Sequence, residues 1–225
     1  MIDKFIIRGV NMKEIEKISK QTVERYSDRY KKLGHDVKTL GWGTTQQQFY
    51  RFEQTLDCNV DFKNKSIVDI GCGFGDYYRF LLAKEIEVSK YIGYDINENL
   101  ISEAKNSTSN IVSFEVVDIL NNELINTADI GVMLGLLNFN LKDSEKNLEY
   151  SKIFIQKAFN MVNELLIVDF LSSNLTSNYK KEDFVYYHNP IEMLDFAFSL
   201  SSNIVLKHNY LPIPQKEFML FIYKD

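Results

Sequence analysis

The stretch that decides the fold is Ile67-Val68-Asp69-Ile70-Gly71-Cys72-Gly73-Phe74-Gly75-Asp76, an apolar run that enters a Gly-x-Gly-x-Gly turn. Glycine allows positive φ angles and lets a ligand approach the backbone where a Cβ atom would collide. The helix predicted after the turn, residues 76–83, directs free backbone N–H groups towards the crevice. This order of strand, glycine turn and helix is typical of an open α/β sheet that binds a nucleoside-type cofactor.

Asp76 distinguishes between two such cofactors. A dinucleotide-binding fingerprint has a third glycine at this position, and a carboxylate there would repel a pyrophosphate. An acid at a helix N-terminus is favourable by itself and tolerates a cationic or zwitterionic ligand. S-adenosylmethionine carries an ammonium and a sulfonium, so the turn favours it over NAD. The cofactor contacts predicted from this stretch are Asp69, Gly71, Cys72, Gly73 and Gly75.

Two further strand-like runs each end in an acid. Residues 90–95 end at Asp95, and residues 112–118 end at Asp118. Asp95 is suited to accept hydrogen bonds from both ribose hydroxyls, and Asp118 from an adenine amino group. Because open α/β sheets bind ligands outside the carboxyl ends of their strands, both acids support a nucleoside site. The residues that follow them, Ile96 and Ile119, are added to the predicted cofactor contacts.

From about Leu40 to Tyr223 the sequence resembles the class I S-adenosylmethionine-dependent methyltransferases. The resemblance rests on VDIGCGFG (68–75), YIGYDI (91–96), VVDI (116–119) and DIGVMLGLLN (129–138). It implies a seven-stranded sheet whose last strand is antiparallel, with Asp95 on the ribose and Asp118 near the adenine. Gly135, in the fourth motif, is expected beside the cofactor. Leu134 departs from the small polar residue expected there, so no side-chain hydrogen bond to the cofactor is predicted from it.

An earlier segment, LGWGTTQQQFYRF (40–52), resembles one found in a poorly characterised bacterial branch of that family. Gln48 and Arg51 share a face of the helix predicted to begin at Thr44 or Thr45. Arg51 is expected to pair with the cofactor carboxylate, or else to be a solvent-facing arginine on an amphipathic helix. Trp42 is expected either to cover the methionine end of the cofactor or to fill the junction between the N-terminal helix and the sheet.

The order of periodic segments predicts a Rossmann-like, doubly wound α/β sheet. Apolar residues at helical spacing predict a helix from Met12 to about Leu33, and strands and helices alternate after it. The near-continuous apolar run 164–170 is typical of a strand buried on both faces. The last two strands, residues 203–208 and 217–223, are joined too briefly for a parallel crossover, so they should pair antiparallel.

The length and composition favour one compact domain. At 225 residues, 45% of them hydrophobic and 13% aromatic, the chain can bury a substantial core without splitting. Within this unit, residues 1–43 are expected to form a helical lid and residues 44–225 the catalytic domain. Glycines beside Trp42 would act as hinges while the tryptophan excludes water. The alternative is that the N-terminal helix packs as fixed core.

The net charge of −5 argues against the broad basic surface that nucleic acids need. Cys58 and Cys72 provide neither a disulfide framework nor metal-ligand spacing, so no metal site is predicted and a reducing cytoplasm is expected. Residues 1–8 lack the apolar length of a signal peptide, and no run of 18 apolar residues occurs. Neither export nor a membrane span is expected, and the protein is predicted to be a monomer or a homodimer.

Two of the three candidate catalytic residues lie in a loop that is expected to bind the methyl acceptor. Tyr187 and His188 belong to a loop, residues 186–190, after the fifth predicted strand, where the resemblance places an acceptor pocket. Histidine is the side chain best suited to remove a proton near pH 7, so His35 and His188 are candidates beside Tyr187, against structural or surface roles. Methyl transfer needs mainly alignment and exclusion of water, and it needs a base only for a protonated acceptor.

The sequence therefore predicts an S-adenosylmethionine-dependent methyltransferase that acts on an oxygen or nitrogen of a small molecule or peptide end, a carboxylate included. The product of the cofactor would be S-adenosylhomocysteine. One alternative is an RNA methyltransferase, against which the acidic charge and the lack of an Asn-Pro-Pro-Tyr-like segment after Leu134 count. The other is a catalytically silent, cofactor-binding partner of another enzyme.

Overall fold

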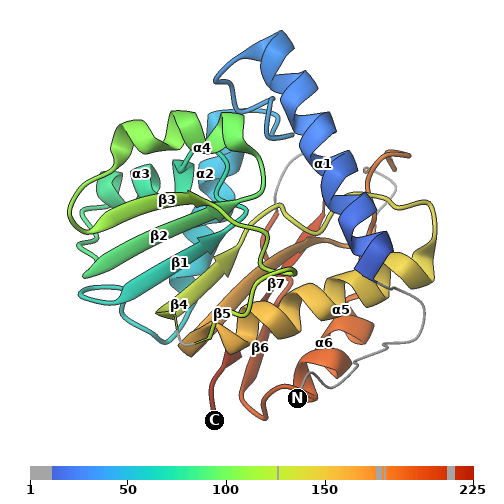
Figure 1. Cartoon of the computed structure of the whole chain (residues 1–225). Coiled ribbons are helices and arrows are strands. Elements are labelled where there is room, and N and C mark those ends of the chain that lie inside the picture. The colour runs from blue at the N-terminus through green and yellow to red at the C-terminus, as the bar shows by residue number, and fades with distance from the viewer. Residues whose placement is uncertain (1–11, 126, 176–178, 180, 212–215) are drawn as a thin grey trace.

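The computed structural model describes residues 12–125, 127–175, 179, 181–211 and 216–225. The strands of these residues form one seven-stranded sheet in the order β3-β2-β1-β4-β5-β7-β6 (Figure 1). They are β1 (Ser66–Ile70), β2 (Lys90–Asp95), β3 (Val112–Val116), β4 (Ala128–Met133), β5 (Val162–Leu171), β6 (Ile204–Lys207) and β7 (Glu217–Tyr223). Strands β1 to β5 pair in parallel, whereas β7 is antiparallel to both β5 and β6. The predicted doubly wound sheet with an antiparallel last strand is thereby confirmed.

Helices cover both faces of this sheet. They are α1 (Met12–Leu33), α2 (Thr45–Gln54), α3 (Asp76–Ala83), α4 (Glu98–Ala104), α5 (Ser144–Asn160) and α6 (Pro190–Phe198). Helices α2, α3 and α4 lie on one face, and α5 and α6 lie on the other (Figure 1). None of the helices in the described ranges is both long and apolar enough to cross a membrane.

Strand β7 shows why the sheet is buried on both faces. Phe218, Leu220 and Ile222 belong to the core beneath α5 and α6, and Met219 and Phe221 belong to the core beneath α2 and α3. Successive side chains of a strand point to opposite faces, so a continuous apolar run fills both cores at once. The same alternation holds for the apolar run in β5, as the sequence predicted.

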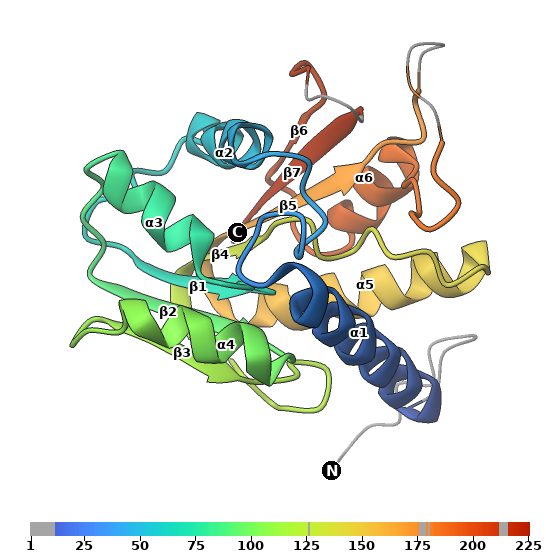
Figure 2. The ribbon, with the colours of Figure 1, turned by 90° about the horizontal axis from the view of Figure 1, so that it is seen from above.

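Helix α1 lies beyond the carboxyl ends of the central strands (Figure 2). Ser19 Oγ donates a hydrogen bond to Asp118 Oδ2 over 2.9 Å, and Asn97 Nδ2 donates to the Val23 carbonyl over 3.1 Å. The helix therefore contacts the loops that follow β3 and β2. Only Ile15 and Ile18 of α1 are fully buried.

One boundary agrees with the sequence prediction and one differs from it. Thr44 is the N-cap of α2, and its side chain accepts a bond from the Gln47 N–H over 3.1 Å; α2 ends at Gln54 and continues as one 3-10 turn. Strand β3 ends at Val116, so Asp118 lies two residues beyond it. There the Asp118 carboxylate accepts from the Leu120 N–H over 2.9 Å, which forms a turn typical of aspartate.

Candidate active site

The glycine turn after β1 requires glycine both for its backbone and for its packing. Gly71, Gly73 and Gly75 have φ angles of 79°, 54° and 78°. A Cβ atom on Gly73 would lie 2.9 Å from the Leu40 side chain, and one on Gly75 would lie 2.7 Å from the Phe114 ring. Larger residues would be strained and would also collide, so the turn stays open towards the crevice.

Asp95 is oriented towards this turn by two backbone donors. Its Oδ2 accepts from the Gly73 N–H over 3.0 Å, and its Oδ1 accepts from the Asn97 N–H over 2.8 Å. Burial raises the pKa of the Asp95 carboxyl, and these backbone bonds oppose the rise. The carboxylate at the end of β2 is thus rigidly placed beside the glycine turn.

A first cavity of about 110 Å³ follows the carboxyl edge of the sheet from this turn to the loop after β3. Most of the predicted cofactor contacts line it, although they come from separate parts of the sequence. These are Trp42, Gln48, Asp69, Gly71, Cys72, Gly73, Asp95, Ile96, Asp118, Ile119 and Gly135. Helix α1 closes one side of the cavity with Ile18, Ser19, Thr22 and Tyr26.

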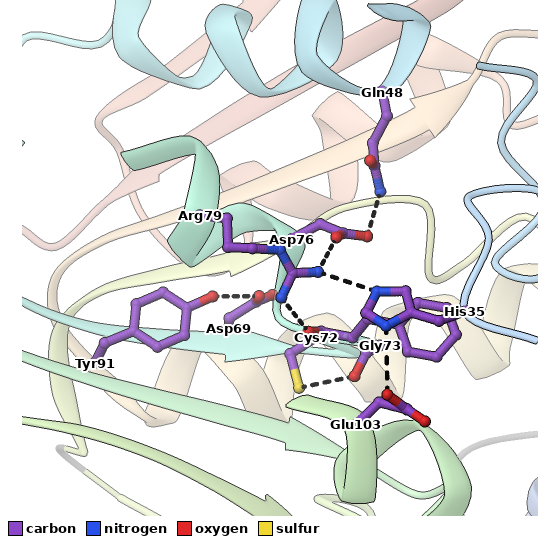
Figure 3. Close-up of polar contacts among 10 residues, drawn as sticks. His35, Gln48, Asp69, Cys72, Gly73, Asp76, Arg79, Tyr91 and Glu103 are labelled. Atoms are coloured by element: carbon purple, nitrogen blue, oxygen red, sulfur yellow. Dashed lines mark hydrogen bonds and ion pairs between the residues drawn. The ribbon is translucent and has the colours of Figure 1, made fainter. Parts of the chain in front are cut away.

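Gln48 has a free acceptor at this cavity. The side chain is 1% exposed, and its Nε2 donates to Asp76 Oδ2 over 3.0 Å (Figure 3). Its Oε1 is buried and has no hydrogen-bond partner among the described residues. A buried amide oxygen normally accepts a bond. Asp76 Oδ1 is paired with Arg79 and its Oδ2 accepts from Gln48, so the amide oxygen is the unpaired acceptor here that suits an ammonium group.

Asp69 forms the buried floor of the site. The Tyr91 hydroxyl donates to Asp69 Oδ2 over 2.5 Å (Figure 3). Burial raises the pKa of Asp69 to about 7 and outweighs this hydrogen bond. Burial likewise raises the pKa of the Cys72 thiol well above its ordinary value, so Cys72 is not an activated nucleophile.

Two predicted cofactor contacts lie outside the first cavity. Gly75 is the N-cap of α3 and packs against the β3 side chain Phe114. Arg51 is 4% exposed, its Nε donates to Glu217 Oε1, and its guanidinium lies 5.0 Å from the Trp42 ring centroid. The solvent-facing alternative for Arg51 is therefore wrong, and its guanidinium is bound within the protein.

His35 lies on the outer side of the glycine turn. Its ring stacks on Phe74 with centroids 4.1 Å apart, and its Nδ1 lies 3.4 Å from Glu103 Oε2 (Figure 3). Arg79 approaches the other ring nitrogen at 3.4 Å. These contacts tie the segment after α1 to α3 and α4, and His35 lines neither cavity.

His188 and Tyr187 also lie away from the cavities. His188 is 1% exposed, and its Nε2 donates to the Leu137 carbonyl over 3.0 Å. Burial lowers the pKa of His188 to about 4, so the ring is neutral near pH 7. The Tyr187 hydroxyl accepts from the Glu182 N–H over 2.9 Å. The structure therefore does not bring the three predicted catalytic residues together: His35 lies in the segment after α1, and Tyr187 and His188 share the loop before α6 but bond to different partners.

A second cavity of about 290 Å³ adjoins the first. The two cavities share Tyr26, Leu40, Trp42, Gly135 and Phe139 as walls. The polar side chains that line only the second cavity are Arg25, Arg29, Arg51, Asn138, Glu182 and Glu217.

Glu217 is one of the lining residues that the sequence analysis missed. It is the first residue of β7, and it pairs with Leu171, the last residue of β5. An acid at the start of an antiparallel strand reaches the same edge of the sheet as acids at the ends of parallel strands. That signal was available once β7 was predicted to be antiparallel.

The described residues contain no group of three or more His, Cys, Asp and Glu side chains placed to hold a metal ion. The first cavity does fit S-adenosylmethionine. Asp95 presents a carboxylate for hydroxyl groups, and Gln48 presents an oxygen that no described residue bonds. These chemically distinct acceptors match the ribose and the ammonium of that cofactor.

Comparisons with known proteins agree with this fold. Solved structures of the magnesium protoporphyrin IX methyltransferase from Synechocystis PCC 6803 are 14% identical to this chain. The form with bound SAH has a TM-score of 0.66 and covers 92% of this chain and 99% of that chain. The form with bound SAM has a TM-score of 0.59 and covers 97% and 99%. The small RNA methyltransferase HEN1 is 16% identical, with a TM-score of 0.58 over 79% of this chain and 25% of that chain.

At these identities the solved structures show a shared fold. No curated protein matches the sequence. The family described as a methyltransferase domain matches residues 61–212, which is more than half of the chain and includes the glycine turn and both strand-end acids. The chain therefore belongs to the class I S-adenosylmethionine-dependent methyltransferases.

Proposed function

We propose that this enzyme transfers a methyl group to an oxygen or nitrogen of a small molecule or of the exposed end of a peptide. The observation that carries the proposal is the second cavity, about 290 Å³ in volume, which shares Trp42 and Gly135 with the cofactor cavity. A recess of this size accommodates a small ligand or one terminal group of a peptide. An acceptor there would border the cofactor across the shared walls.

The cofactor supplies a methyl group that is already activated on a cationic sulfur. The protein's part is then to bind both reactants, align them and exclude water. Asp95 would hold the ribose hydroxyls, Ile119 and Asp118 would border the adenine, and Gln48 with Asp76 would receive the ammonium. The apolar walls Trp42 and Leu40 would keep water from the junction of the two cavities.

We also propose that residues 1–43 act as a lid on a catalytic domain formed by residues 44–225. In support, side chains of α1 line both cavities, and Gly41 between α1 and α2 has a φ angle of 91° that favours glycine. The contacts from Ser19 to Asp118 and from Asn97 to Val23 link α1 to the loops after β3 and β2, which would border the nucleoside. Cofactor binding and closure of α1 would then favour each other.

The test is to incubate the protein with deuterated-methyl S-adenosylmethionine and an extract of metabolites and peptides, and to identify labelled products by mass spectrometry. A labelled small molecule or peptide, formed equally after nuclease treatment, is the expected result. Nuclease-sensitive labelling would instead identify an RNA methyltransferase. Binding of the cofactor without any labelled product would identify a catalytically silent partner protein.

A further inference from the structure

Glu217 has one carboxylate oxygen without a hydrogen bond. The residue is 1% exposed, and Arg51 donates to its Oε1. Its Oε2 is buried, and no residue that the structure describes bonds to it. Leaving a polar oxygen unbonded away from water is costly, and native proteins rarely do so without a functional reason. This oxygen is therefore available to a ligand.

The position of Glu217 indicates which ligand this is. The residue lines the second cavity together with Trp42 and Gly135, and these two residues also line the cofactor cavity. Its pairing with Leu171 fixes it at the carboxyl edge of the sheet, where the cofactor cavity also lies. A molecule in the second cavity can thus contact Glu217 and border the cofactor at the same time.

The surroundings of Glu217 leave it able to take up a proton. The charged and titratable groups that face it are Arg51 from α2, Asp169 from β5, the neighbouring Lys216, and Tyr210 from the segment after β6. Burial raises the pKa of Glu217 to about 8, although Arg51 opposes the rise. A general base works best when its pKa lies near the working pH.

We propose that the second cavity binds an acceptor with an N–H or O–H nucleophile, and that Glu217 Oε2 accepts the hydrogen bond and then the proton of that group. The inference rests on the proposed methyltransferase function. It narrows the acceptor class from any oxygen or nitrogen to protic groups, that is amines, amides, alcohols or phenols. It also assigns Glu217 as a catalytic residue.

The reaction is balanced without a further reagent. A lone pair of the acceptor nitrogen or oxygen forms the new bond to the methyl carbon. The carbon–sulfur bond breaks, and its electron pair stays on sulfur, which becomes neutral. The acceptor proton moves to the Glu217 carboxylate, which becomes a neutral carboxylic acid and later returns the proton to water. A positive and a negative charge are therefore removed together, which suits a buried carboxylate such as that of Glu217.

If the acceptor were a carboxylate, Glu217 would have to be protonated instead of ionised. Two carboxylates in contact repel each other, so Glu217 would have to be protonated and donate a hydrogen bond to the acceptor. Methylation would then slow as the pH rises through the pKa of Glu217. With a protic acceptor it accelerates over the same range, and the two cases are separable by a pH profile.

The test compares wild-type protein with Glu217→Gln and with the control Glu53→Gln. Glu53 pairs with Lys84 on the surface of α2 and lines neither cavity. All three proteins receive deuterated-methyl S-adenosylmethionine and the metabolite and peptide extract, and the rate of labelling is followed from pH 6 to 9. Calorimetric binding of S-adenosylhomocysteine is measured on each protein in parallel.

We expect labelled products that carry a new N-methyl or O-methyl group at a protic site, and a wild-type rate that rises with pH and levels off above about 8. Glu217→Gln should lower the rate by roughly 100-fold or more and abolish the pH dependence, because loss of a general base typically costs 10²- to 10⁴-fold. Its affinity for S-adenosylhomocysteine should stay within about twofold of wild type, and Glu53→Gln should behave as wild type.

Labelling of carboxylates as methyl esters, or a wild-type rate that falls as the pH rises, would overturn the inference and leave the methyltransferase function intact. So would a Glu217→Gln variant with full activity, or one that loses S-adenosylhomocysteine binding together with activity. If that variant does not fold, the wild-type products and pH profile decide the question. Cofactor binding with no labelled product from wild-type protein would overturn the proposed function, and this inference with it.

Discussion

At the scale of single residues, the Asp95 carboxylate has the position and the burial expected of a ligand-binding group. Its carboxylate borders the first cavity, and burial raises its pKa despite bonds from Gly73 and Asn97. We predict that Asp95→Asn weakens S-adenosylhomocysteine binding roughly tenfold or more in calorimetry, because hydrogen bonds to charged groups contribute about 1.5 to 3 kcal/mol each. The amide keeps the shape of the side chain but can accept only one of the two backbone bonds from Gly73 and Asn97, so we expect the free energy of unfolding to fall by about 0.5 to 1.5 kcal/mol.

Glu98→Gln, at an exposed acid in the first turn of α4, is the control for Asp95→Asn. It should bind S-adenosylhomocysteine as wild type does. Normal binding by Asp95→Asn would mean that the carboxylate serves only the turn between β1 and α3, and the ribose contact would have to be sought elsewhere.

Alanine substitutions at Gly73 and Gly34 separate the effect of backbone strain from the effect of a side chain placed at the cofactor site. Gly73 and Gly34 have φ angles of 54° and 65°, but a Cβ on Gly34 would meet nothing within 4 Å, whereas one on Gly73 would lie 2.9 Å from Leu40. We predict that alanine at Gly34 costs about 1 to 2 kcal/mol of unfolding free energy through backbone strain. Alanine at Gly73 should cost more, because its Cβ would also lie 2.9 Å from Leu40. Only Gly73→Ala should also lose cofactor binding. Equal binding by both variants, measured by calorimetry, would contradict this.

At the scale of elements, α1 contacts the rest of the protein at the loops that follow β2 and β3, at α4 and at α5. Two of its residues are fully buried, while Ser19 bonds to Asp118 and the Val23 carbonyl accepts from Asn97. A helix held by few apolar contacts and several polar ones belongs to the less stable part of a fold, from which lids are drawn.

Deleting residues 1–38 tests the lid directly. On the lid interpretation the shortened protein stays folded and still binds S-adenosylhomocysteine, because Asp95 and the glycine turn remain, but it no longer transfers methyl groups. Circular dichroism, calorimetry and labelling with deuterated-methyl cofactor measure these three properties. An insoluble product would instead support α1 as fixed core, and full activity would exclude both interpretations.

At the scale of the whole molecule, buried acids make folding depend on pH. Burial raises the pKa of Asp69 to about 7, of Asp169 to about 6 and of Glu217 to about 8. An acid whose folded pKa lies above its unfolded value binds more protons in the folded state. Each of these acids therefore lowers the free energy of unfolding as the pH rises from its unfolded to its folded pKa. His188, with its pKa lowered to about 4, acts in the opposite direction below pH 6.5.

Asp69→Asn isolates one of these contributions. The amide does not ionise and can still accept the hydrogen bond from Tyr91. We predict that the variant gains stability relative to wild type as the pH rises from about 4 to about 7, and that the difference is constant above that. Denaturant unfolding at pH 5, 6, 7 and 8 measures it. A difference that does not change with pH would show that Asp69 is ionised throughout.

Much of the fold follows from local sequence. The helix Met12–Leu33, the start of α2 at Thr45 and the strand Lys90–Asp95 lie where periodicity and capping predicted them. The glycine turn and the acid that ends β2 also converge as predicted. Such features are local: a 3.6-residue or 2-residue repeat, a cap or a turn glycine acts within a few residues of chain.

Tertiary structure decided the rest of the site. The sequence alone determined the alternating strands and helices, the glycine turn and the cofactor class, since those depend on short-range patterns. It did not determine that Arg51 binds Glu217, 166 residues away. Nor did it determine that His188 is buried and bonds to the Leu137 carbonyl. These contacts arise because antiparallel β7 brings its first residue beside the end of β5, and only the assembled sheet defines which distant side chains share one edge.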